Sequence, residues 1–208
     1  ENFLYAAFAS ANTVKFREKS IELGELYLNN KAWKKYRADV TFIMCNAYRL
    51  QADTLRKEAA SLQTAMSTID KNRAAKAREQ SAQFYQRFFL LCDDFLTVMP
   101  DHKYAKDFVN MMGAVYFVNR KYDALLEKFA GYENGEMNPS KGFVNRPEFR
   151  KSPGMATAHY MSGLALLATG RFEEAKPMLA AVVGVNVEGL PLDDGGLTTY
   201  DDDEGEGN

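Results

Sequence analysis

The side chains that could carry out chemistry are few in this sequence and widely separated. The histidines are His102 and His159, and the cysteines are Cys45 and Cys92. Structural zinc sites use closely spaced ligand pairs such as C-x-x-C or H-x₃-H, and neither pair occurs here. We expect His102 to be exposed at a helix start and His159 to be a packing residue. We expect the cysteines to be two buried free thiols and not a disulfide framework.

The acidic residues do not indicate a catalytic pair either. Asp93 and Asp94 are adjacent, and neighbouring residues on a helix point about 100° apart, so the two carboxylates are poorly placed to act on one substrate. The motifs G-x-G-x-x-G, G-x-x-x-x-G-K-[ST] and G-x-S-x-G are absent. We interpret Asp93 and Asp94 as solvated or partner-facing carboxylates. The sequence thus predicts a protein that is not an enzyme and that holds no cofactor or metal.

The sequence predicts mainly α-helices as the elements that position these residues. None of the six prolines falls within residues 1–99, and all except Pro177 stand where a helix is expected to stop. No sustained alternation of apolar and polar residues predicts a strand, and Asn134-Gly135 is interpreted as part of a long loop over residues 133–153. The expected helices cover residues 4–28, 32–69 with or without a break, 75–98, 104–118, 122–132, 156–168 and 172–183.

Two apolar stripes lie side by side within residues 84–96 at helical spacing. One comprises Phe84, Phe88, Leu91 and Phe95, and the other comprises Tyr85, Phe89, Cys92 and Leu96. A helix that is apolar on two faces is packed on both sides, so we expect these residues in the core, with a face reserved for a partner as the alternative. The basic stretch 56–78 is interpreted as a solvated helical pair with a turn near residues 70–72, and docking to an acidic partner is its alternative.

Composition and charge favour a folded chain with a distinct acidic end. The 208 residues are 46% hydrophobic and 12% aromatic, and no run of about 18 apolar residues predicts a membrane span. The net charge of −2 is unevenly distributed, because all 26 basic and only 20 acidic residues lie within residues 1–182. The remaining eight acidic residues follow without any base, so a basic body is joined to a strongly acidic tail.

The acidic tail, residues 191–208, has too few apolar residues to bury a core of its own. We expect it to lie in extended form against a basic surface, either on this chain or on a partner, held by several weak ion pairs and a few apolar anchors. The candidate partner-contact residues are Leu192, Leu197, Tyr200, Asp201, Asp202 and Asp203.

A pattern of small and large residues occurs three times with the same offsets. A glycine is followed three residues later by Tyr or Leu, and nine residues later by an aromatic residue that follows a turn. A small residue lets two helices approach closely, and the aromatic residue is expected to pack back on the first helix, so the pattern predicts helical hairpins in which Gly163 faces Ala175. The residues assigned to this packing are Gly24, Tyr27 and Trp33, then Gly113, Tyr116, Tyr122 and Phe129, and finally Gly163, Leu166, Gly170, Phe172, Ala175 and Leu179.

These hairpins resemble tetratricopeptide and pentatricopeptide repeats. The third copy fits best, whereas Tyr36 and Leu125 stand where the first and second copies would have a further small residue. The copies begin 89 and 50 residues apart, while these families repeat about every 34 or 35 residues. The resemblance implies an all-α fold of antiparallel helical hairpins, stacked as a short solenoid over residues 1–190 and followed by the extended acidic tail.

The resemblance implies a non-enzymatic scaffold or accessory subunit that binds other proteins within a larger assembly. In size and repeat type the chain is similar to the pentatricopeptide-like subunits of euglenozoan mitochondrial ATP synthases, which implies a mitochondrial complex. The alternative is RNA binding of the pentatricopeptide type, which requires regular repeats with polar side chains that read the bases. The irregular spacing and the acidic tail, which repels phosphate, favour protein binding over RNA binding.

Overall fold

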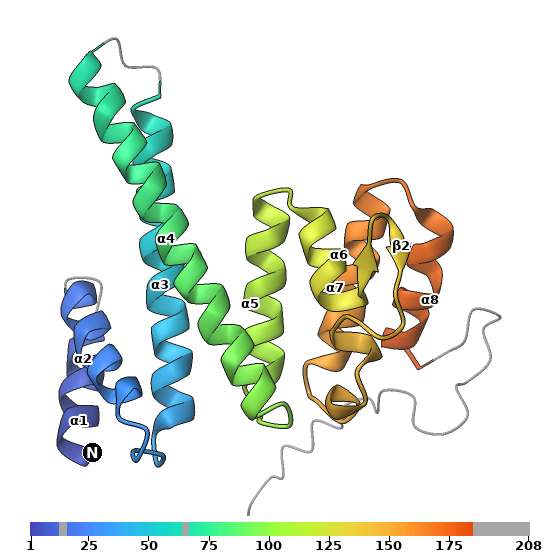
Figure 1. Ribbon diagram of the computed structural model, residues 1–208, viewed down its shortest axis with the longest axis horizontal. Coiled ribbons are helices and arrows are strands. Elements are labelled where there is room, and N and C mark those ends of the chain that lie inside the picture. The colour runs from blue at the N-terminus through green and yellow to red at the C-terminus, as the bar shows by residue number, and fades with distance from the viewer. Residues whose placement is uncertain (13–15, 64–66, 185–208) are drawn as a thin grey trace, which may run out of the picture. The chain divides into compact units, whose positions relative to one another are not determined.

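The computed structural model describes residues 1–12, 16–63 and 67–184, and these residues are mostly α-helical, as predicted (Figure 1). Eight α-helices are formed within the described ranges. They are α1 (Asn2–Ala11), α2 (Arg17–Asn29), α3 (Arg37–Ser61), α4 (Thr68–Val98), α5 (Ala105–Val118), α6 (Tyr122–Ala130), α7 (Met155–Ala168) and α8 (Phe172–Val182). No helix within these ranges is long and apolar enough to cross a membrane.

The helices form two compact units. The first unit comprises Glu1–Val98 and contains α1 to α4, and the second begins at Met99 and contains α5 to α8. The sequence led us to expect one repeat domain over residues 1–190. The boundary coincides with the end of α4 at Val98, two residues before Pro100, where a helix stop was expected because proline restricts the residue before it.

In the first unit the helix boundaries differ from the expected ones. The helix expected over residues 4–28 is two helices, α1 and α2. The helix expected from residue 32 begins only at Arg37, and the turn expected near residues 70–72 is wrong, because α4 already begins at Thr68. The hydroxyl of Ser67 explains this early start, since its Oγ accepts a hydrogen bond from the backbone N–H of Ile69 at 3.2 Å, as a helix N-cap does.

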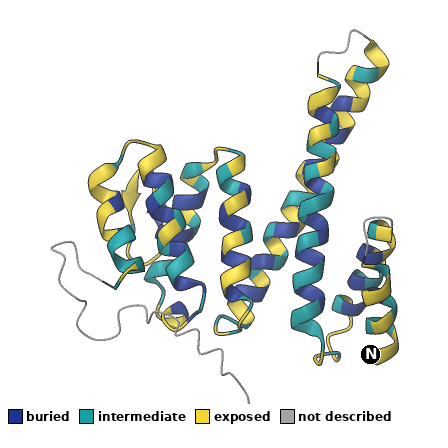
Figure 2. Cartoon of the chain, turned by 180° about the vertical axis from the view of Figure 1, so that it is seen from behind, coloured by how far each residue is buried: buried dark blue, intermediate teal, exposed yellow. Residues whose placement is uncertain are grey.

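Helices α3 and α4 pack against each other and form the centre of the first unit. Toward the end that adjoins residues 64–66 the buried residues of this pair are small, and exposed residues prevail there (Figure 2). Ser81 on α4 also donates a hydrogen bond to the backbone oxygen of Ala52 on α3 at 2.8 Å. The other end contains large buried residues, namely Val40, Met44, Phe88, Phe95 and Leu96.

The second unit is built from two helical hairpins. A short turn joins α5 to α6 and another joins α7 to α8, while α7 also packs on both α5 and α6. Large buried side chains from three of these helices fill the interior. They are Phe108, Val109, Met112, Leu125, Leu126, Phe129 and Leu166.

The loop between the two hairpins contains a small β-sheet that the sequence analysis did not predict. Strands β1 (Tyr132–Glu133) and β2 (Glu136–Met137) pair in antiparallel fashion around Asn134-Gly135. Both turn residues have positive φ, 53° and 87°, which is the conformation that Asn-Gly adopts in two-residue hairpins. The exclusion of strand was therefore wrong here. The rest of the loop includes the 3₁₀ turns η2 (Phe143–Asn145) and η3 (Pro147–Phe149).

Candidate protein-binding groove

The three glycines of the repeated pattern each lie where a helix approaches another side chain closely. A methyl group on Gly24 would collide with Met44 of α3 and with Phe8 of α1, whose Cε2 would be 2.9 Å away. One on Gly113 would lie 2.8 Å from Cγ of Met161, which belongs to α7 and not to the hairpin partner of Gly113. Close helix approach is thus present at all three glycines, although the helix that approaches differs from copy to copy.

The third copy corrects one expectation. Gly163 lies against Leu179 of α8, because a methyl group on Gly163 would lie 2.5 Å from Cδ2 of Leu179. Phe172, expected to pack back on the first helix, is 61% exposed. The buried side of α8 is formed by Ala175 and Met178. With a rotation of 100° per residue around the helix axis, Phe172 lies about 60° from Ala175 and about 120° from Met178.

The other residues assigned to repeat packing lie mainly in the interior. Tyr27, Phe129, Leu166 and Ala175 are buried, whereas Trp33, Tyr116 and Tyr122 are half-buried and Gly170 is exposed in a turn at φ 77°. Tyr122 does pack on the preceding helix, because its ring lies edge-to-face against that of Phe117 with the ring centroids 5.1 Å apart. The candidate tail contacts Leu192, Leu197, Tyr200, Asp201, Asp202 and Asp203 lie outside the described residues.

The two cysteines lie in the first unit, with their sulfur atoms 3.5 Å apart, and the two histidines lie in the second. Cys45 and Cys92 are buried free thiols, as predicted, and His159 is half-buried in α7. His102 is half-buried instead of exposed, and its Nδ1 accepts a hydrogen bond from the backbone N–H of Tyr104 at 3.2 Å. Within the described ranges, no three His, Cys, Asp or Glu side chains gather in a geometry that could hold a metal ion.

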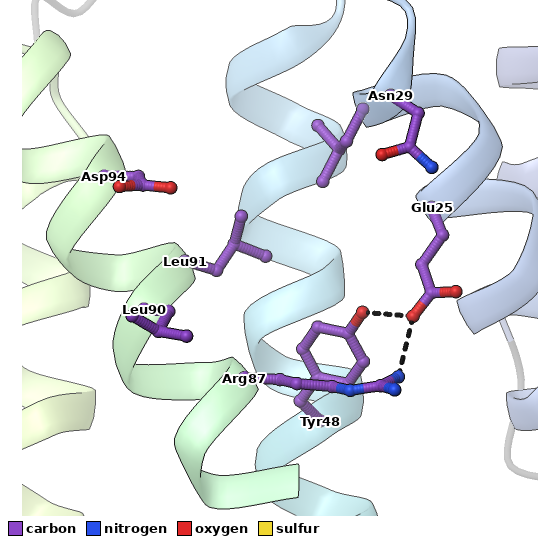
Figure 3. Close-up of a pocket in the computed structure, with 8 residues that line it drawn as sticks. Glu25, Asn29, Tyr48, Arg87, Leu90, Leu91 and Asp94 are labelled. Carbon is purple, nitrogen blue, oxygen red and sulfur yellow. Dashed lines mark hydrogen bonds and ion pairs between the residues drawn. The ribbon is translucent and has the colours of Figure 1, made fainter. Parts of the chain in front are cut away.

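A surface groove of about 310 Å³ lies in the first unit between α2, α3 and α4 (Figure 3). Glu25, Leu28 and Asn29 line it from α2, Tyr48 lines it from α3, and Arg87, Leu90, Leu91 and Asp94 line it from α4. These eight residues will be called the groove residues.

One end of the groove is held by a hydrogen-bonded network across three helices. The carboxylate oxygen Oε1 of Glu25 accepts a hydrogen bond from the hydroxyl of Tyr48 at 2.7 Å and one from the guanidinium of Arg87 at 3.0 Å. Burial raises the pKa of Tyr48, and the hydrogen bond to Glu25 raises it further, so the hydroxyl remains a donor at neutral pH. The Tyr48 hydroxyl therefore ties α3 to α2 at this wall of the groove, and the Arg87 guanidinium ties α4 to the same carboxylate.

The remainder of the groove combines apolar and acidic groups. Leu28 and Leu91 are half-buried, while the side chain of Leu90 is 57% exposed. Asp94 is exposed on the same helix, and no ion pair joins its carboxylate to another described residue. The groove thus offers leucine side chains beside one uncompensated negative charge, which suits an apolar side chain with a basic neighbour.

Sequence reasoning found only part of this groove. Asp94 was interpreted as solvated or partner-facing, and Leu91 was assigned to an apolar stripe. The core assignment of the stripes is confirmed for Phe88, Cys92, Phe95 and Leu96, which are buried. Leu90 belongs to neither stripe, and this was the available signal that its side chain is exposed.

The comparisons with known proteins add no family to this description. No protein-family model matches the chain, and neither the curated proteins nor the solved structures contain a significantly similar one.

Proposed function

We propose that this chain is a non-enzymatic helical scaffold or accessory subunit that binds another protein within a larger assembly. The observation that carries this proposal is the groove, where Leu90 is 57% exposed beside the half-buried Leu91 and Leu28. Exposed apolar surface in a concave site that also carries a free charge is typical of a protein-binding surface. The partner segment has one or two apolar side chains for the leucines and a Lys or Arg for Asp94.

The packing of the second unit supports the helical-repeat part of the proposal. In tandem helical hairpins each hairpin packs on its neighbour, so that the first helix of one contacts both helices of the preceding one. In the second unit α7 packs in this way on α5 and on α6. We therefore propose a short stack of antiparallel hairpins, and the acidic tail at 191–208 would supply a second contact with the partner.

The resemblance to the pentatricopeptide-like subunits of mitochondrial ATP synthases suggests which assembly to examine first. Those subunits are stable components of a mitochondrial complex, so a mitochondrial assembly is the setting that we propose for this chain. This setting rests on the resemblance in size and repeat type, whereas the binding surface rests on the groove.

The test compares native complexes that contain the tagged wild-type chain or one of two variants. Leu90→Asp should remove the partner, because it replaces the exposed apolar side chain of the groove with a carboxylate, which is unfavourable to bury against an apolar side chain of the partner. Ile69→Asp is the matched control, because Ile69 is also an exposed apolar residue of α4, at 78%, but does not line the groove. Quantitative mass spectrometry of the purified complexes measures the partner.

The expected result is loss of one set of proteins from Leu90→Asp and its retention by Ile69→Asp. Equal partner recovery from all three chains would exclude the groove as the binding surface. A wild-type chain that is recovered only as a monomer under native conditions would exclude the accessory-subunit proposal as a whole.

A further inference from the structure

The two cysteines of the first unit lie in contact although 47 positions separate them in the sequence. Cys45 lies on α3 and Cys92 on α4, and their Sγ atoms are 3.5 Å apart, with the Cys92 thiol donating a weak hydrogen bond to the Cys45 sulfur. Both side chains are fully buried, with 0% exposure. The packing of α3 against α4 therefore brings the only two thiols of the chain together in the interior.

This arrangement is suited to bond formation between the two sulfur atoms. A disulfide bond is about 2.05 Å long, so the sulfur atoms must approach by roughly 1.5 Å, which small side-chain rotations can supply. The pair is enclosed by apolar helix positions, since Met44 precedes Cys45 and both Phe88 and Phe95 are buried on α4. A bulky oxidant such as glutathione disulfide has no room beside these thiols, whereas a molecule of the size of water can reach them during a local opening of the helices.

We propose that Cys45 and Cys92 form a reversible intramolecular disulfide when the folded chain encounters hydrogen peroxide. The bond would join α3 to α4 and would be a modification site of the first unit. The proposal does not depend on the groove or on the proposed partner.

The chemistry balances with one peroxide molecule for each pair of thiols. One cysteine, as its thiolate, attacks a peroxide oxygen, so that an S–O bond forms, the O–O bond breaks and hydroxide leaves, taking up a proton to become water. The sulfur of the second cysteine then attacks the sulfur of the sulfenic acid, forming the S–S bond, breaking the S–O bond and releasing a second water. Two electrons pass from the sulfur atoms to the peroxide oxygens.

The buried geometry also determines which oxidation product accumulates. A sulfenic acid that is exposed to solvent can react with further peroxide to give a sulfinic acid, which is essentially irreversible. Here the partner sulfur is 3.5 Å away in the wild-type chain, so it captures the sulfenic acid before a second peroxide enters. Without that partner the same sulfur should proceed to the sulfenic or sulfinic acid.

The experiment treats the folded full-length chain with hydrogen peroxide, quenches it with catalase, denatures it in the presence of N-ethylmaleimide and measures the intact mass. We expect the wild-type chain to lose the mass of two hydrogen atoms and to take up no maleimide, and to show a higher Tm that dithiothreitol reverses. Cys92→Ala and Cys45→Ala are the matched variants, and each should gain one or two oxygen atoms, trappable with dimedone at the first stage, with no rise in Tm.

Three results would overturn the proposal. The first is a wild-type chain whose two thiols stay fully alkylatable under conditions that oxidise the same chain in urea. The second is accumulation of sulfinic acid in the wild type at the rate seen in the single variants. The third is a disulfide that joins two chains and not Cys45 to Cys92. If the variants do not fold, the wild-type mass and the dithiothreitol-reversible Tm decide the question.

Discussion

Gly163 on α7 lies against Leu179 on α8, and the missing side chain of the glycine is the space that the leucine occupies. A methyl group on Gly163 would lie 2.5 Å from Cδ2 and 2.6 Å from Cγ of Leu179, which is closer than non-bonded carbon atoms approach. Gly163 is buried, so a larger residue has no route into solvent. The close pairing of α7 and α8 therefore depends on the absence of a side chain at this position.

Gly163→Leu should lower the free energy of unfolding by about 1–3 kcal/mol, because a leucine overpacks the contact with Leu179. Urea denaturation followed by circular dichroism measures the change. The double variant Gly163→Leu/Leu179→Ala should recover part of the lost stability, since the alanine vacates the space. A single variant as stable as the wild type would show that α7 and α8 do not approach closely at this position.

Gly131 and Gly135 share a backbone conformation but differ in the space around them, so substitutions at the two positions distinguish the effect of backbone strain from that of steric collision. Both have positive φ, 76° and 87°, where a Cβ atom is unfavourable. A Cβ on Gly131 would collide with the backbone oxygen of Lys141 and lie 2.7 Å from that of Asn138, whereas one on Gly135 would have nothing within 4 Å. The two glycines therefore differ in their surroundings much more than in their conformation.

Gly135→Ala should cost about 1–2 kcal/mol, which is the strain of the left-handed conformation alone. Gly131→Ala should cost distinctly more, because backbone atoms must also move, and we expect about 3 kcal/mol or more. Thermal and urea denaturation of the two variants check the order. Equal losses would show that the loop over residues 133–153 does not pack on the end of α6 as described.

Local sequence patterns predicted the second unit better than the first. The helices α5 to α8 begin and end within one or two residues of the expected positions, because Gly131 ends α6 with φ 76° and a short turn separates each helix pair. In the first unit the late start of α3 depends on contacts that no local pattern contains. The hydroxyl of Tyr27, for example, accepts a hydrogen bond from the backbone N–H of Tyr36 at 3.1 Å.

The groove could not be predicted in the same way, because its walls are distant in sequence. Glu25 and Arg87 meet across 62 positions, and their pairing requires α2 to lie beside α4. The apolar spacing within residues 84–96 correctly indicated the buried side of α4. The same spacing did not indicate which helices pack beside α4, so it could not predict that Leu90 stays exposed.

The Tyr48–Glu25–Arg87 network leads to a prediction about which of its two contacts stabilises the fold. The side chains of Glu25 and Arg87 are 41% and 57% exposed, so Arg87→Met should cost only about 0–1 kcal/mol, and salt should reduce that cost. The ring of Tyr48 is buried, and Tyr48→Phe removes a 2.7 Å hydrogen bond while keeping the ring, so it should cost about 0.5–1.5 kcal/mol.

Urea denaturation at low and high salt distinguishes the two contacts. The effect of Tyr48→Phe should persist at high salt, and that of Arg87→Met should disappear. The opposite pattern, with Arg87→Met the larger and salt-independent loss, would mean that the ion pair and not the tyrosine holds α2 to the other two helices.

The last prediction concerns His159, whose burial lowers its pKa from 6.5 to about 4. Its Nδ1 is buried and has no hydrogen-bond partner among the described residues, so the folded chain favours the neutral ring. The unfolded chain binds a proton more readily between these two pKa values. The contribution of the neutral ring to the free energy of unfolding is fully present above about pH 6.5 and is lost as the pH falls toward about 4. The total loss is at most about 3 kcal/mol.

Urea denaturation at about pH 7 and about pH 5 measures this loss, which should be about 2 kcal/mol for the wild type. His159→Gln should lose much less over the same interval, since glutamine does not titrate. Carboxylates with lowered pKa, such as those of Glu133 and Glu174, lose their contribution only below their ordinary value of 4.5 and so do not interfere. A His159→Gln chain that loses as much stability as the wild type would show that this ring is not buried in the folded protein.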